Sequence, residues 1–316
     1  MGLDIILRKI KEYNTIIIHG HVRPDGDCYG AQFGLKDIIS NTFPKKNVYV
    51  VGETSDYVAF VGDVDTIDDS VYEGALSIVV DTATSDRISD QRYSLAREVI
   101  KIDHHIPVDQ YGDIIWVDTN FPSCSQMIAY FYQKYHGELM LTETGAIALY
   151  TGIVTDTGRF RHRGVDELTH RLAGMLVTKG AIPEEIDLEL SRESLNSVKL
   201  KGYVLSNFEM SKHGFAYFKM TRDIIKKFKV SDEDAAAMVS MLGGIENHPV
   251  WALIIEYPDS IRMRLRSNGP IISDIANEFE GGGHAQAAGG KLNSWREVKK
   301  LIKLVDARII EWRKNK

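Results

Sequence analysis

The first half of the chain alternates two kinds of apolar pattern. Short runs of β-branched and aliphatic residues are typical of buried strands, and apolar residues that recur every three or four positions are typical of amphipathic helices. Strands that alternate with helices predict an α/β fold, in which a mostly parallel sheet is flanked by helices. We expect strands at 15–19, 48–51, 77–81, 99–103 and 114–117, and helices at 3–13, 27–40, 124–136, 142–154 and 166–179.

The pattern changes after the middle of the chain. Residues 184–207 are polar, periodic and nearly free of Gly and Pro, which predicts a linker helix and a boundary near 190 to 210. The later apolar runs resemble antiparallel strands, and basic residues crowd the C-terminal end in the pattern of an amphipathic helix. The expected elements are strands at 215–220, 251–256 and 261–266, and helices near 231–242, 271–279 and 296–316. We therefore divide the chain into an N-terminal domain (1–188), a linker helix (189–212) and a smaller α/β domain with a mixed sheet (213–316).

Composition narrows the class of protein. The chain has 316 residues, of which 44% are hydrophobic and 26% charged, as expected of a soluble protein with about two domains. It contains no run of 18 apolar residues, so we expect a cytoplasmic protein without a membrane partner. Its two cysteines, Cys28 and Cys124, are expected to be small buried residues in a reducing compartment. A net charge of −6 disfavours coating of long nucleic acids and leaves room for a short anionic ligand.

Acidic and imidazole side chains follow three of the expected strands. His21, Asp25 and Asp27 come after the first strand, in a loop that Pro24 and Gly26 tighten. In open α/β sheets, ligands bind beyond the carboxyl ends of the strands, so these side chains would converge on one crevice. Asp27 taken alone is equally well interpreted as the N-cap of the next helix.

The same arrangement recurs along the chain. Asp81 ends the strand at 77–81, the triplet 103–105 (Asp-His-His) ends the next strand, and Asp156 closes a helical run. Any one of these acids could be a loop cap, but the repeated placement favours one shared site. Carboxylates and imidazoles without cysteine suit Mn²⁺, Mg²⁺ or Fe²⁺ better than structural zinc. Their number fits two ions about 3.5–4 Å apart that share a carboxylate, an arrangement used in phosphoester hydrolysis.

Two features of the last third could bind an anion. Arg262, Arg264 and Arg266 alternate and so share one face of a strand, although a solvated strand edge has the same pattern. Residues 281–284 (Gly-Gly-Gly-His) would let a phosphate approach the backbone closely, and we expect His284 to begin a small-residue helix. A flexible linker is the alternative interpretation of the glycines.

These residues also carry a family resemblance. In chain order, residues 21–27 (His-Val-Arg-Pro-Asp-Gly-Asp), Asp81, the triplet 103–105 and Asp156 resemble the four motifs of the DHH phosphoesterase superfamily. Residues 281–284 resemble the signature of its DHHA1 C-terminal domain. Within the superfamily the chain is similar to the branch of bifunctional oligoribonucleases (nanoRNases) and 3′-phosphoadenosine 5′-phosphate (pAp) phosphatases.

The resemblance implies roles for individual residues. One ion would be bound by His21, Asp25 and Asp81, and the second by Asp27, Asp81, His104 and Asp156, with Asp81 as the bridge. Mn²⁺ is the first choice for both ions, and Mg²⁺ or Co²⁺ are alternatives. His105 would either donate a proton to the leaving oxygen or bind the phosphate, and Asp103 would orient a histidine. The implied substrate-binding residues are Arg159, Arg262, Arg264, Ser267, Gly282, Gly283 and His284.

The implied activity is that of a hydrolase. It would be a Mn²⁺-dependent phosphodiesterase and exoribonuclease that degrades short RNA to mononucleotides, and a 3′(2′),5′-bisphosphate nucleotidase that converts pAp to AMP. No binding of long polymers is expected, and a homodimer is left open. One alternative is a phosphodiesterase for c-di-AMP or pApA. Another is a catalytically inactive nucleotide-binding regulator, which would lack one of the metal ligands.

Overall fold

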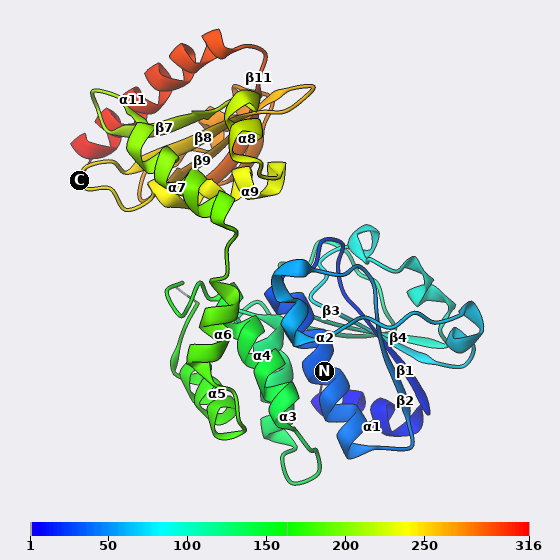
Figure 1. Cartoon of the computed structure of the whole chain (residues 1–316). Coiled ribbons are helices and arrows are strands. Elements are labelled where there is room, and N and C mark those ends of the chain that lie inside the picture. Colours follow the sequence, from blue (N-terminus) through cyan, green and yellow to red (C-terminus); the bar gives the residue numbers. More distant parts are fainter. Residues whose placement is uncertain (1, 163, 316) are drawn as a thin grey trace. The chain divides into compact units, whose positions relative to one another are not determined.

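The structure is a computed structural model that describes residues 2–162 and 164–315. It divides into two compact units, Met1–Arg192 and Glu193–Lys316, which Figure 1 shows in blue to green and in green to red. Among the described residues, no helix combines the length and the apolar character that crossing a membrane requires.

The first unit is built on a five-stranded parallel sheet with the order β2-β1-β3-β4-β5. Alternate residues of β1 serve the two faces: Ile16 and Ile18 belong to the main core with the helices, whereas Ile17 packs with Tyr72 on the other face. All five carboxyl ends lie at one edge, since the strands are parallel. The strands are β1 (Thr15–His19), β2 (Asn47–Val51), β3 (Leu76–Val80), β4 (Glu98–Asp103) and β5 (Ile114–Val117).

Six α-helices and four short 3₁₀ helices complete the described part of this unit. The α-helices are α1 (Leu3–Glu12), α2 (Gly26–Thr42), α3 (Cys124–Lys134), α4 (Glu143–Asp156), α5 (Glu167–Thr178) and α6 (Pro183–Leu190). The 3₁₀ helices are η1 (Asp56–Val61), η2 (Asp69–Tyr72), η3 (Ser85–Arg87) and η4 (Gln91–Leu95).

Helices α2 and α4 pack unusually close together through glycines. Gly26, Gly30 and Gly34 recur every four residues and so lie on one face of α2. A Cβ atom on Gly30 would come within 2.6 Å of the carbonyl oxygen of Ala148 and 2.9 Å of the Cα of Gly152, both on α4. This close approach brings the start of α2 next to the end of α4, where Asp156 lies.

The second unit contains a six-stranded mixed sheet with the order β10-β11-β9-β8-β7-β6. Strands β7 and β8 are parallel and the other pairs antiparallel. In Figure 1, α7, α8 and α9 cover one face and α11 the other. The elements are α7 (Leu195–Asn207), β6 (Glu209–Met210), β7 (Phe215–Met220), α8 (Arg222–Phe228), α9 (Asp232–Ala237), η5 (Met238–Leu242), β8 (Val250–Glu256), β9 (Ile261–Ser267), α10 (Ser273–Asn277), β10 (Gly282–His284), β11 (Ala287–Leu292), η6 (Trp295–Glu297) and α11 (Val298–Lys314).

The structure confirms the predicted fold class and corrects three of the expectations in particular. The stretch 184–207 is not one linker helix: it forms α6 and α7 with a break between them, and the two units divide inside that break. Strands β7 and β8 pair in parallel where antiparallel pairing was expected. His284 does not begin a helix but ends β10, which forms a hairpin with β11.

We predict that Gly30→Ala destabilises the protein by about 1–2 kcal/mol, because overpacking against the α4 backbone outweighs the gain in helix propensity. Urea denaturation of the metal-free protein measures the change. The matched control is Gly174→Ala on the exposed side of α5, where a Cβ meets nothing within 4 Å and a small gain in stability is expected. Equal stability of Gly30→Ala and wild type would contradict the close packing.

Candidate metal centre

Acidic and imidazole side chains gather where β1, β3 and β4 end. Their close spacing follows from the parallel sheet, which brings segments far apart in the sequence to the same edge. The helix α4 adds one more acid at its last residue. The cluster consists of His21, Asp25, Asp27, Asp81, Asp103, His104, His105 and Asp156.

The carboxylate of Asp81 lies between the two halves of this cluster. Its Oδ2 is 3.5 Å from His21 Nε2, and its Oδ1 is 3.4 Å from His104 Nε2 and 3.6 Å from His105 Nδ1. Asp81 has a φ of 52°, in the left-handed region, which Asp tolerates better than most residues. Its Oδ1 is buried and has no hydrogen-bond partner among the described residues. A buried carboxylate oxygen without a donor is a natural ligand for a cation.

His21 and His104 turn the same ring nitrogen toward the carboxylates. Their other nitrogens lie next to backbone carbonyls: His21 Nδ1 is 2.9 Å from the oxygen of Val22, and His104 Nδ1 is 3.2 Å from that of Phe121. A proton on Nδ1 donates to the carbonyl and leaves the Nε2 lone pair for a metal, the usual state of metal-binding histidines.

Asp27 is fixed by the first turn of α3. Its Oδ2 accepts a hydrogen bond from the backbone N–H of Cys124 at 2.5 Å, and its Oδ1 accepts one from that of Ser125 at 2.8 Å. These N–H groups have no partner inside their own helix, and the positive end of the helix dipole stabilises the carboxylate further. Asp27 is therefore held rigidly on the side of the cluster that faces α3.

The N-cap of α2 is Asp25, which corrects the alternative that gave this role to Asp27. The Asp25 Oδ1 accepts hydrogen bonds from the N–H groups of Asp27 and Cys28, at 3.0 and 3.1 Å. Its side chain is 57% exposed and lies 3.8 Å from His21 Nε2. Asp25 thus marks the open side of the cluster.

Burial of the cluster disfavours the negative charges of its carboxylates. Burial, followed by repulsion from Asp81, raises the pKa of Asp27 well above its ordinary value and that of Asp156 to about 6. Burial alone would lower the pKa of His104, but its contacts with the carboxylates outweigh burial and raise this pKa to about 10. Protons on the histidines thus partly balance the acids, and a divalent cation can replace them.

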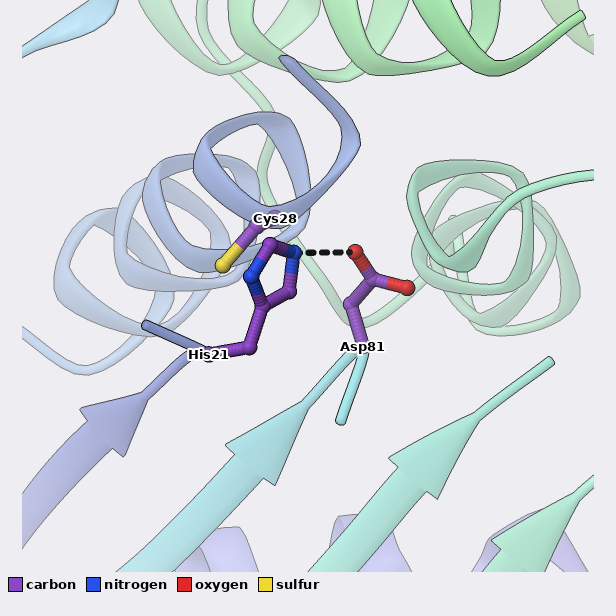
Figure 2. Close-up of side chains that lie close together, drawn as sticks. All are labelled: His21, Cys28 and Asp81. Atoms are coloured by element: carbon purple, nitrogen blue, oxygen red, sulfur yellow. Dashed lines mark ion pairs between the residues drawn. The ribbon is translucent and has the colours of Figure 1, made fainter. Parts of the chain in front are cut away.

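The residues present fit a divalent cation in three overlapping sets. Within each set, the potential ligand atoms lie within 4.8 Å of one another. Two sets contain only carboxylate and imidazole groups, and the third, drawn in Figure 2, includes a thiol that the sequence analysis treated only as a buried residue. The sets are Asp27–His104–Asp156, Asp81–His104–His105 and His21–Cys28–Asp81.

His105 is oriented from behind by Asp103. The ring Nδ1 of His105 is 2.8 Å from Asp103 Oδ1, which also accepts a hydrogen bond from the His105 backbone. The hydrogen bond to Asp103 raises the pKa of His105, which favours its protonated form. On the other side of Asp103, the ammonium of the buried Lys101 lies 3.6 Å from Oδ2 and donates to the carbonyl oxygens of Ala83 and Asp109.

The cluster opens into a cavity of about 140 Å³. Besides the expected residues, Ala83 and Arg87 line it. Arg87 was missed, although its place in the loop after β3 is a signal that sequence reasoning could have used. Its backbone carbonyl accepts a hydrogen bond from Val22, which ties the loops after β1 and β3 together. An exposed guanidinium at this cavity suits an anionic ligand.

Arg159 does not line this cavity. Its guanidinium binds Asp187 of α6 through Nε at 2.5 Å and Ser191 through Nη2 at 3.0 Å. Its φ of 58° places it in a left-handed turn after α4. The structure thus shows an arginine that already has an acidic partner in the first unit, and its role in substrate binding stays a prediction.

The arginines of β9 line an open face of the second sheet. Arg262 and Arg264 are exposed, whereas Met263 between them and Leu265 after them are buried in the core. The register places Gly289 beside Arg264 and Gly282 beside Gly289, so the two strand positions next to Arg264 carry no side chain of their own. A pocket of about 390 Å³ lies here, lined by Ile255, Tyr257, Arg262, Met263, Arg264, Glu280, Gly281, Gly289, Gly290 and Lys291.

The other predicted substrate-binding residues are divided between the two faces. Gly282 and His284 alternate onto the face of Arg264, and Gly283 onto the opposite one. Ser267 also lies on the opposite face, with a buried hydroxyl that has no partner among the described residues. Close hairpin packing requires Gly281, because a Cβ there would lie 2.0 Å from the carbonyl oxygen of Gly289. The glycines therefore form a shaped hairpin, not a flexible linker.

Two family models match the chain. The model described as "DHH family, N-terminal domain" matches residues 15–153, which include β1 to β5 and most of the cluster. The model described as "DHHA1 domain" matches residues 214–311, the greater part of the second unit.

Relatives of known name match almost the whole chain. It is 40% identical over 299 residues to the bifunctional oligoribonuclease and PAP phosphatase NrnA of Bacillus subtilis, with 94% of this chain and 95% of the relative covered. It is 39% identical to the probable enzyme of the same name from Streptococcus mutans, covering 94% and 98% of the two chains. A solved exopolyphosphatase-related protein from Bacteroides fragilis has the same fold, with a TM-score of 0.85, 24% identity and 97% of each chain covered.

We predict that Asp156→Asn stabilises the metal-free protein at neutral pH. A carboxyl group whose pKa is raised on folding contributes stability below its unfolded pKa near 3.8, and this is lost as pH rises through about 6. In EDTA, the variant should match wild type near pH 4 and exceed it by about 1 kcal/mol at pH 7, after allowance for solvent screening. Thermal denaturation across this range measures the difference.

Asp86→Asn, an exposed acid in η3, is the matched control and should show no such pH-dependent gain. A variant Asp156→Asn that is no more stable than wild type at pH 7 would show that its charge is already balanced.

Proposed function

Since the chain belongs to the DHH family and carries a DHHA1 domain, we propose that it hydrolyses short RNA oligonucleotides to mononucleotides and converts pAp to AMP. The names of the relatives support these two substrates. The observation that carries the proposal is the position of Asp81, whose two oxygens face separate groups of potential ligands. A reducing cytoplasm is the proposed location, in keeping with the free thiols of Cys28 and Cys124.

Two divalent cations would bind at this cluster. His21, Asp25 and Asp81 would hold one, and Asp27, Asp81, His104 and Asp156 the other. We propose Mn²⁺ for both, because oxygen and imidazole donors suit this ion, and Mg²⁺ or Co²⁺ are the alternatives. When bound, the ions would lower the pKa of the attacking water and neutralise charge on the phosphate.

The side chains on the open side of the cluster would handle the substrate. The hydrogen bond with Asp103 raises the pKa of His105 and so favours the protonated imidazole, which can protonate the leaving oxygen or donate a hydrogen bond to the phosphate. Lys101 balances the buried charge of Asp103 and keeps it in place. Arg87, at the rim of the same cavity, is a further candidate to bind the phosphate.

The face of β9 would bind the remainder of the nucleotide chain. Arg262 and Arg264 offer two cations beside the bare backbone of Gly282 and Gly289, which lets a phosphate approach closely. A few arginines are enough for a substrate of a few nucleotides, which agrees with a net charge of −6. His284 lies on the same face, whereas Gly283 and Ser267 would act through the backbone or through the shape of the hairpin.

The two alternative functions, an inactive regulator and a phosphodiesterase for c-di-AMP or pApA, are distinguished in different ways. A catalytically inactive regulator would lack a ligand, and all six proposed ligand residues are present. A phosphodiesterase for c-di-AMP or pApA would use the same chemistry, so only a substrate panel separates it. Turnover of pAp, pApA, c-di-AMP, RNA dinucleotides and a long single strand, each with Mn²⁺, Mg²⁺ and Co²⁺, tests the proposal. Fastest hydrolysis of c-di-AMP, or binding of pAp without turnover, would overturn it.

We predict that Asp81→Asn lowers kcat/KM for both pAp and RNA dinucleotides by about a thousandfold or more, because the substitution removes the charge shared by the two proposed ion sites. Steady-state assays with saturating Mn²⁺ measure the loss. Asp86→Asn again serves as the control, and circular dichroism shows whether each variant is folded. Near-normal hydrolysis by a folded Asp81→Asn protein would refute the assignment.

We also predict that Arg264→Ala raises KM for RNA dinucleotides by about tenfold and changes turnover of a small phosphate ester little, because the lost contact binds the substrate away from the reacting phosphate. The control is Arg296→Ala, an exposed arginine of the same unit outside the pocket. Equal effects on the large and the small substrate would argue against a binding role for Arg264.

A further inference from the structure

Cys28 has no part in the proposed reaction, yet its thiol belongs to the cluster. It lies in the first turn of α2 and is fully buried. Its Sγ lies within 4.8 Å of potential ligand atoms of both His21 and Asp81. Figure 2 shows the three side chains converging from α2, from the loop after β1 and from the end of β3.

The missing side chain of Gly20 leaves room for this sulfur. A Cβ on Gly20 would come within 2.2 Å of Cys28 Sγ, so the thiol packs directly against the residue before His21. On its far side the thiol donates a weak hydrogen bond to Gln32 Oε1 at 3.6 Å. The sulfur is thus held against the cluster without a strong competing partner.

The burial of its members distinguishes this set from the ligands expected for the first ion. The Asp81 Oδ2 atom lies 3.5 Å from His21 Nε2, whereas the unpaired Oδ1 faces His104 and His105. Asp25, the other residue expected to bind an ion with His21, is largely exposed, whereas His21, Cys28 and Asp81 are all buried. The three buried groups offer one nitrogen, one sulfur and one oxygen. This donor set suits thiophilic cations better than it suits the harder Mn²⁺ and Mg²⁺.

We propose that His21, Cys28 and Asp81 form an alternative site for a thiophilic divalent cation such as Zn²⁺, Cd²⁺ or Co²⁺, with the Cys28 thiolate in place of Asp25. On binding, the S–H bond breaks, a sulfur–metal bond forms, and the proton passes to the buffer, with no change in oxidation state. The inference rests on the proposed metal centre but not on the proposed reaction. In this proposal, the thiolate of Cys28 allows soft cations to bind at a site that otherwise suits hard cations.

Cobalt substitution tests the site spectroscopically. Metal-free wild-type protein titrated with Co²⁺ should develop a sulfur-to-cobalt charge-transfer band in the near ultraviolet, which oxygen and nitrogen ligands do not give. Cys28→Ser should lose the band, and Cys124→Ser, which removes the other buried thiol, should keep it. Because the chain has only two cysteines, a band in Cys124→Ser assigns the ligand even if Cys28→Ser fails to fold.

Calorimetry supplies a second measurement. Cys28→Ser should weaken Cd²⁺ binding by about tenfold or more and change Mn²⁺ affinity far less, because only the soft cation uses the sulfur. Absence of the band in wild type saturated with Co²⁺, or its persistence in Cys28→Ser, would overturn the proposal. Hydrolysis of pAp with Mn²⁺ is assayed on the same preparation, so failure of the proposed function is a separate result.

Discussion

Repulsion among the carboxylates of Asp27, Asp81 and Asp156 is the constraint around which the first unit is organised. Burial, followed by repulsion from Asp81, raises the pKa of Asp27 and Asp156, which means that the fold opposes their ionisation. The structure tolerates them through contacts that require accurate placement: two histidines turned by backbone carbonyls, and the amides at the start of α3. The close carboxylates are unfavourable without a cation and favourable around one. Relief of their repulsion therefore adds to the free energy of cation binding.

Much of this arrangement can be predicted from the sequence, because the rule behind it is local. Each strand of the first unit is a short apolar run, and the acid or histidine at its end lies at a known edge once the sheet is parallel. The five strands were therefore placed within a residue or so of their observed bounds. The residues of the cluster could be collected by the same rule, because each follows a strand or closes a helix. Their roles as ligands stay predictions.

What could not be predicted depends on packing between distant segments. Nothing near Cys28 in the sequence shows that its sulfur faces Asp81, since that follows from the fit of α2 against β1. The glycines at 281–283 look like a loop or a helix start, but their close approach to β11 makes them a hairpin. Ser267 follows three arginines in sequence and yet lies on the face opposite theirs, because the strand extends one residue further than expected.

The support of Asp27 has a consequence for how such proteins vary. The groups that bind its carboxylate are main-chain amides of Cys124 and Ser125, which every residue except proline possesses. A substitution at either of these buried positions therefore keeps the hydrogen bonds to the Asp27 carboxylate, as long as the new side chain fits and α3 still begins there. An essential part of the site thus leaves almost no trace in sequence patterns, and its loss would come from a shifted helix start.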